Sequence, residues 1–129
     1  LLPKLLELTG VSWTLHQYVN QREYGAVPVG AIRALKLLPS EEKVTLPGID
    51  FFVKYIDGEY MDYCLASRGF RMPTRHFSNI RGHSFSVGTV YLPHDVEGYL
   101  EGHYGDWRTP KQDWSLNQIK SATVFTAED

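Results

Sequence analysis

The chain has 129 residues, of which 43% are hydrophobic and 13% are aromatic. A chain of this size and composition can bury a core of its own, so we expect residues 1–129 to form a single domain. The formal net charge of −2 argues against a nucleic-acid-binding protein, because such proteins normally carry a strongly basic surface.

The cysteine content and the hydropathy limit the class further. Cys64 is the only cysteine in the sequence, which excludes an intramolecular disulfide bond and a cysteine-rich zinc site. No apolar run approaches the roughly 20 residues that a helix needs to span a bilayer, so we expect no membrane span in this chain. The leucine-rich start lacks the basic region and the cleavage site of a secretory signal peptide.

The N-terminal part of the chain alternates between helical and extended patterns. Leu1 to Leu8 place leucines at helical spacing before Gly10, which predicts a short helix with one buried face. Apolar and polar residues then alternate from Val11 to His16, which is the period of a half-buried strand. After a loop with the sequence GAVPVG at Gly25 to Gly30, the apolar spacing predicts a helix from Ala31 to Leu38.

A β-hairpin is predicted in the middle of the chain. Two β-prone runs, Ile49 to Ile56 and Glu59 to Leu65, flank the dipeptide Asp57-Gly58, which favours a tight turn with positive φ. The following segment, Ser67 to Ser84, is predicted to be mostly loop. Phe85 to Tyr91 then alternates apolar with small or polar residues, which predicts another strand.

The C-terminal part carries a short helix and an aromatic turn. The helix is predicted from Val96 to His103, with Gly105 just beyond its last turn. The large side chains from Tyr104 to Trp114 can seal the edge of a core. Together these elements predict an α+β domain, in which flanking helices accompany a mixed or antiparallel sheet.

The order of residues in this part is also similar to the closing motif of the LicD and fukutin family. That motif has a strand ending in proline, a short helix of the form x-x-Tyr-Leu, then Tyr-Gly-Asp-Trp and a proline. A weaker upstream similarity places Leu5 to Leu15 at the family's first helix and strand, and Gly25 to Arg33 at its glycine motif. The resemblance covers about half of the chain. The closing motif is matched by Leu92, Pro93, Tyr99, Leu100, Tyr104, Gly105, Asp106, Trp107 and Pro110.

The resemblance implies a nucleotidyltransferase-like fold and a transfer reaction. It implies that a phosphorylated alcohol or sugar, phosphocholine-like or polyol-phosphate-like, moves from a CDP-linked donor to a cell-surface glycan acceptor. Such chemistry needs carboxylates that hold Mg²⁺ on the phosphates and donors that offset negative charge. By the resemblance, Gly25, Gly30 and Arg33 would bind the donor phosphates, helped by backbone amides at the start of the predicted helix. A plain loop is the structural alternative for this segment.

The acidic residues match the family less well. The family's metal site is typically a pair of aspartates one residue apart, and no Asp-x-Asp follows Pro39. The nearest carboxylates are Glu41 and Asp50, which we predict as the catalytic residues and Mg²⁺ ligands. A solvated surface is the alternative for Glu41. Either the metal site is lost or relocated, or a segment with the aspartates is absent between Pro39 and Ile49; the second account is favoured because family domains are usually longer.

A basic segment offers a third group of candidates. Ser67 to Ser84 contains four arginines, two histidines and no acidic residue. Because arginine forks match phosphate oxygens, we predict Arg75, His76 and Arg81 as phosphate contacts, with the two arginines neutralising a pyrophosphate. The alternative is that the basic side chains pair with the acids that follow, which are Asp95, Glu97, Glu101 and Asp106.

Two functions therefore remain open for this sequence. The first is the transferase that the resemblance implies. The second is a non-catalytic module that binds an anionic glycan or a protein through the aromatic turn and the basic segment. The missing Asp-x-Asp favours the module, and the glycine motif favours the transferase.

Overall fold

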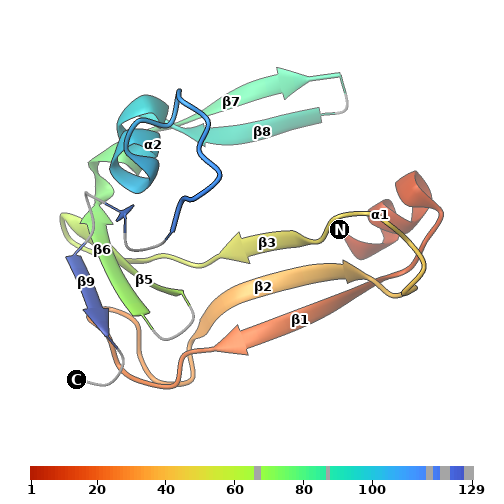
Figure 1. Ribbon diagram of the computed structural model, residues 1–129, viewed down its shortest axis with the longest axis horizontal. Coiled ribbons are helices and arrows are strands. Elements are labelled where there is room, and N and C mark those ends of the chain that lie inside the picture. The colour runs from red at the N-terminus through yellow and green to blue at the C-terminus, as the bar shows by residue number, and fades with distance from the viewer. Residues whose placement is uncertain (66–67, 87, 116–117, 120–122, 127–129) are drawn as a thin grey trace.

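The computed structural model describes residues 1–65, 68–86, 88–115, 118–119 and 123–126. Within these residues, three small antiparallel sheets and two α-helices make up a β-rich fold. Figure 1 shows an open arrangement: a three-stranded sheet and a two-stranded hairpin both extend from the side of the molecule that holds a four-stranded sheet. No helix in the described ranges is long and apolar enough to cross a membrane.

The three-stranded sheet has β2 in its centre. Both neighbours pair with β2 in antiparallel register, and Ala34 and Leu37 on β2 are buried. The flanking strands are largely exposed. The sheet consists of β1 (Trp13–Val19), β2 (Ile32–Pro39) and β3 (Ile49–Phe52). Helix α1 (Leu2–Thr9) lies at its end, ends at Gly10 with φ 72°, and has no buried residue.

The four-stranded sheet carries the hydrophobic core. It consists of β4 (Tyr55–Asp57), β5 (Tyr60–Leu65), β6 (Arg68–Pro73) and β9 (Thr123–Thr126), in the order β4-β5-β6-β9. Five of the six residues from Tyr60 to Leu65 are buried, because β5 is a central strand. The core residues are Met61, Tyr63, Leu65, Phe70, Met72 and Ile119, with Phe77, Tyr99 and Trp114 packed against them.

The third unit connects the core to the aromatic turn. It consists of the 3-10 helix η1 (Thr74–Phe77), the hairpin of β7 (Ile80–Phe85) and β8 (Gly88–Pro93), and α2 (Val96–Tyr104). Asp95 caps α2, because its Oδ1 accepts a hydrogen bond from the Gly98 amide at 2.9 Å. The capping carboxylate also reaches buried His76 of η1, with Oδ2 2.9 Å from Nδ1. Helix α2 is thereby fixed to the end of β6 through η1.

The predicted α+β, nucleotidyltransferase-like fold is wrong. The segment from Ala31 to Leu38, predicted as a helix, is mostly the central strand β2. Its apolar residues do recur at helical spacing, but hydrogen bonding to β1 on one side and β3 on the other outweighs that local pattern. The remaining helices are short, and α1 buries no side chain. The predicted helical layer over a sheet is therefore not formed.

The other predicted elements are confirmed in part. The helix at Leu1 to Leu8 forms, without its expected buried face, and the helix at Val96 to His103 forms as α2. The predicted hairpin forms only next to its turn, which is moved by one residue because Asp57 pairs with Tyr60. Ile49–Phe52, predicted as part of its first arm, is β3 and pairs with β2 instead. The loop predicted from Ser67 to Ser84 is wrong from Arg68 onward, since β6, η1 and most of β7 lie there; Ser67 lies outside the described residues.

Candidate functional site

Gly25 lies in a tight turn that is held by an ion pair between partly exposed Arg71 and buried Asp62. The carboxylate of Asp62 on β5 is completely buried, and it accepts hydrogen bonds from Arg71 Nε at 2.7 Å and Nη2 at 2.9 Å. The Ala26 amide donates to the same carboxylate at 2.9 Å. A Cβ atom on Gly25 would lie 2.0 Å from Asp62 Oδ2. Gly25 therefore has a structural role, and its phosphate contact stays a prediction.

This ion pair fastens the turn to the four-stranded sheet. Burial alone would raise the pKa of Asp62, but hydrogen bonds from Arg71 and Ala26 outweigh burial and hold that pKa below its usual value. Asp62 is therefore ionised at neutral pH. The ring of Tyr24 lies against Gly69 on β6, where a Cβ atom would come within 2.5 Å of the ring. Two glycines thus permit the close approach of the turn to the sheet.

Gly30 and Arg33 lie on either side of the start of a strand. Gly30 has a φ of 79°, and its amide donates to the Asn20 carbonyl at 2.8 Å. Arg33 on β2 holds its guanidinium 5.5 Å from the ring centroid of Tyr18. Because β2 begins at Ile32, the loop does not lead into a helix. The helix N-terminus that was expected to bind the donor phosphates is therefore not formed here.

Glu41 and Asp50, the predicted Mg²⁺ ligands, lie on different segments of the chain. Glu41 is exposed in the connection between β2 and β3. Asp50 on β3 forms an ion pair with Lys36, with 3.6 Å between Oδ1 and Nζ. In the described ranges, no group of three or more His, Cys, Asp or Glu side chains could hold a metal ion. These residues do not fit the metal, and Mg²⁺ binding stays a prediction from the resemblance.

The segment around Glu41 has a simple structural role. It joins β2 to β3, which are direct neighbours, with Leu37 aligned to Ile49. A connection between adjacent antiparallel strands can be short. The structure therefore does not require a further element between Pro39 and Ile49.

The basic segment is divided between paired and exposed side chains. Arg71 and His76 pair with Asp62 and Asp95, which agrees in part with the predicted pairing to acids. Arg75 in η1 and Arg81 on β7 are exposed. They are open to solvent, but they lie on separate elements. Arg75 is the neighbour of His76 in η1 and Arg81 lies on β7, and their contact with phosphate stays a prediction.

Among the described residues, the largest group of aromatic side chains lies where α2 packs on the four-stranded sheet. His103 lies in its middle, with its ring centroid 4.6 Å from that of Tyr104 and 5.9 Å from that of Trp114. Tyr63 Oη lies 3.3 Å from His103 Nδ1. Tyr63 is fully buried, whereas Tyr104 is 40% exposed, so the group extends from the core to the surface. We call Tyr63, Tyr99, His103, Tyr104 and Trp114 the aromatic cluster.

Lys54 places an ammonium group against the aromatic cluster. It lies in the two-residue link between β3 and β4, where the Val53 amide donates to the Arg33 carbonyl at 3.0 Å. Lys54 Nζ lies 3.8 Å from the ring centroid of Tyr63 and 5.7 Å from that of Tyr99. None of the described carboxylates forms an ion pair with Lys54. Among the described residues, the cation is therefore stabilised by ring faces.

Burial sets the charge states around this cation. It lowers the pKa of Lys54 to about 8, although the ring faces favour the charged form. Burial, and then the charge of Lys54, lowers the pKa of His103 to about 4, so its imidazole is neutral at pH 7. Burial also raises the pKa of the Tyr63 hydroxyl, which stays protonated. Lys54 therefore carries the positive charge of this region at neutral pH.

Two indole N–H groups beyond α2 have no acceptor among the described residues. They are the buried Nε1 atoms of Trp107 and Trp114. Trp13 differs, because its Nε1 donates to Thr9 Oγ1 at 3.0 Å. A buried donor that loses water without gaining an acceptor is costly. Trp114, a member of the aromatic cluster, therefore carries a buried donor without an acceptor among the described residues.

The arrangement combines two features that a polar ring-shaped ligand needs. Aromatic faces pack against apolar C–H surfaces, and a cation binds an anion. The packing of Trp114 on the core confirms that the aromatic turn seals the core. Lys54 and His103 were not predicted, because lysine in an alternating strand normally faces solvent and α2 gave no sign of its packing partner. The one available signal was that Lys54 has a large apolar neighbour on each side in the sequence, Val53 and Tyr55.

Comparison with known proteins adds no relative. The chain matches no protein-family model, no curated protein and no solved structure. The function is therefore argued from the geometry of the aromatic cluster.

Proposed function

We propose that this chain is a binding module for an anionic glycan, and that the aromatic cluster with Lys54 is its binding site. The ligand is a sugar ring that carries a phosphate or carboxylate group. The exposed parts of Tyr104 and Trp114 would pack against the ring, and Lys54 would bind the anionic group. This is the second of the two functions that the sequence leaves open.

The observation that carries the proposal is the unpaired state of Lys54. In folded proteins, a partly buried lysine normally forms an ion pair with a carboxylate. Lys54 has rings on its inner side and no described carboxylate in an ion pair with it. An anion from outside would restore the missing counter-charge.

The charges of the surroundings agree with an anionic ligand. His103 is neutral at pH 7 because its pKa is about 4, so Lys54 is not repelled by a second cation there. Exposed Arg75 and Arg81 raise the positive potential of the neighbouring elements. A hydrogen bond between charged groups contributes about 1.5–3 kcal/mol. A single sugar phosphate is therefore expected to bind weakly, and longer anionic glycans more tightly.

Nuclear magnetic resonance of the three indole N–H groups tests the proposal. Glucose 6-phosphate is titrated into ¹⁵N-labelled protein, with glucose and inorganic phosphate in separate titrations. We expect the Trp114 signal to shift with saturation, and the Trp13 signal to stay in place because its N–H is bonded to Thr9. Equal small shifts of all three indoles, or no shift with the sugar phosphate, would contradict the proposal.

Transfer from a CDP-linked donor remains a prediction of the resemblance. The fold that the resemblance implies is not the fold observed, and Gly25 and Asp50 are engaged in structural contacts. No observation at the aromatic cluster favours transfer over binding.

A further inference from the structure

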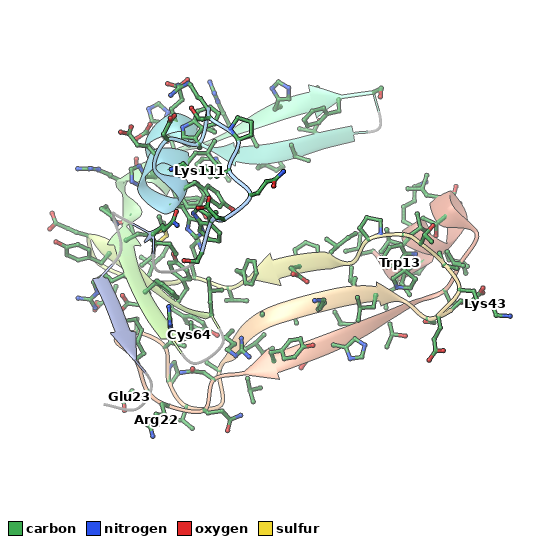
Figure 2. The ribbon with its side chains drawn as sticks, viewed as in Figure 1. Trp13, Arg22, Glu23, Lys43, Cys64 and Lys111 are labelled. Carbon is green, nitrogen blue, oxygen red and sulfur yellow. The ribbon has the colours of Figure 1, made fainter. Side chains whose placement is uncertain are left out.

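The three-stranded sheet has an apolar face whose flanking strands are largely exposed to solvent. Figure 1 shows α1 at one end of this sheet and no other described helix or strand lying across it. Trp13 marks that end (Figure 2), where its indole N–H donates to Thr9 of α1 at 3.0 Å. We propose that a second copy of this chain packs on the apolar face, so that two such sheets stack in a dimer. This proposal does not rest on the binding of an anionic glycan.

The register of the strands decides which side chains share this face. Neighbouring residues of a strand point to opposite faces of a sheet, and paired residues point to the same face. Two adjacent rows of paired residues therefore lie together, and we call them the apolar face. The first row is Leu15, Leu37 and Ile49, and the second row is Gln17, Leu35 and Phe51.

The two faces of the sheet differ in polarity. The opposite face carries the ion pair of Lys36 with Asp50, with 3.6 Å between Nζ and Oδ1. The apolar face has no charged residue in its two rows, yet Leu15 and Phe51 are each 42% exposed and Ile49 is 36% exposed. An antiparallel sheet with this alternation normally packs its apolar face on a core and leaves its polar face in water. The apolar face thus lacks a covering layer among the described elements.

The surface area of the chain is large enough for a dimer interface. The chain exposes 9083 Å², whereas a folded monomer of 14.8 kDa is expected to expose about 7,000 Å². A stable interface of standard size removes about 800 Å² from each partner. The excess exposed area is more than a dimer of standard size needs.

The chemistry of the apolar face fits a second copy of itself. In a dimer with two-fold symmetry, both subunits use the same surface, and a side chain near the axis meets its own counterpart. A charged residue there would be repelled, and the two rows contain none. Gln17 is the one polar member, and its amide both donates and accepts hydrogen bonds, so two copies can satisfy each other. The exposed hairpin fits less well, because β7 carries Arg81.

Sedimentation equilibrium of the wild-type chain and two variants tests the proposal. Phe51→Lys places a charge on the apolar face. Phe52→Lys is the matched control, because Phe52 follows on the same strand, points to the opposite face and is 52% exposed. Since a symmetric dimer loses the contact in both subunits, we expect Phe51→Lys to raise the dimer dissociation constant about a hundredfold. Phe52→Lys should dimerise like wild type, and circular dichroism checks that both variants keep the fold.

Nuclear magnetic resonance of a mixed dimer locates the interface without a substitution. Protein labelled with ¹³C is mixed with unlabelled protein, and we expect contacts between subunits at the methyl groups of Leu15 and Ile49. Three results would overturn the proposal: a wild-type chain that stays monomeric at about 100 μM, equal dissociation constants of the two variants, or subunit contacts confined to Val90 of the hairpin. No sugar phosphate is present, so a failure of the proposed glycan site would leave these results unaffected.

Discussion

Replacement of Gly25 by alanine separates the structural role of the glycine loop from the role in phosphate binding that the resemblance implies. The new Cβ atom would lie 2.0 Å from Asp62 Oδ2 and 2.7 Å from Asp62 Cγ. Gly25 also has a φ of 51°, which disfavours any residue with a Cβ. The substitution must therefore displace the Asp62 carboxylate from Arg71 and Ala26, or move the turn away from β5.

The magnitude follows from these two effects. Positive φ costs a non-glycine residue about 1 kcal/mol. Loss of the hydrogen bonds to the buried Asp62 carboxylate costs about 3 kcal/mol, because a buried charge is left without its partner. We therefore expect Gly25→Ala to lower the free energy of unfolding by about 4 kcal/mol. Gly30→Ala is the matched control, because Gly30 also has positive φ, 79°, and its Cβ would meet nothing within 4 Å.

Urea unfolding, followed by tryptophan fluorescence and by circular dichroism, measures both variants. Gly30→Ala should lose about 1 kcal/mol, so the two variants should differ by about 3 kcal/mol. If Gly25→Ala is no less stable than Gly30→Ala, the assignment of Gly25 to a structural turn is wrong. A loss of ligand binding at full stability would instead support the role implied by the resemblance.

Three further predictions concern titratable groups. The free energy of unfolding of wild type should rise between about pH 8 and pH 10, because the unfolded chain keeps a proton that folded Lys54 has lost. Lys54→Met should reduce this dependence of stability on pH in urea titrations, and an unchanged dependence would contradict the prediction. Wild type should lose stability as the pH falls from about 6.5 to 4, since unfolding lets His103 take up a proton. A His103→Gln variant whose free energy of unfolding falls equally steeply with pH would count against this prediction. Asp95→Ala should speed hydrogen exchange of the Gly98 amide, which it caps, while Glu101→Ala should not.

Local signals in the sequence predicted the ends of elements well. Gly10 and Gly105 end the two helices with positive φ, as expected of glycine beyond a last turn. The Asp57-Gly58 dipeptide marks the tight turn, although Gly58 and Glu59 occupy its centre. These features depend on a few neighbouring residues, and tertiary packing does not change them.

Long-range pairing accounts for what the sequence did not predict. The spacing of apolar residues on β2 fits a helix, and only the presence of β1 and β3 on either side makes it a strand. The candidate site has the same character. Lys54 follows β3 and His103 lies on α2, and both contact Tyr63 of β5. No spacing in the sequence relates these residues.

The affinity of two lysine variants for glucose 6-phosphate tests the proposed site most directly. Lys54→Met removes the cation from the aromatic cluster and keeps an apolar side chain there, while Lys43→Met removes an exposed lysine beyond the end of β2. The loss of one charged hydrogen bond corresponds to a dissociation constant that is about tenfold larger. We expect Lys54→Met to show that loss in the indole titration and Lys43→Met to bind like wild type. Equal affinities of the two variants would contradict the proposed site.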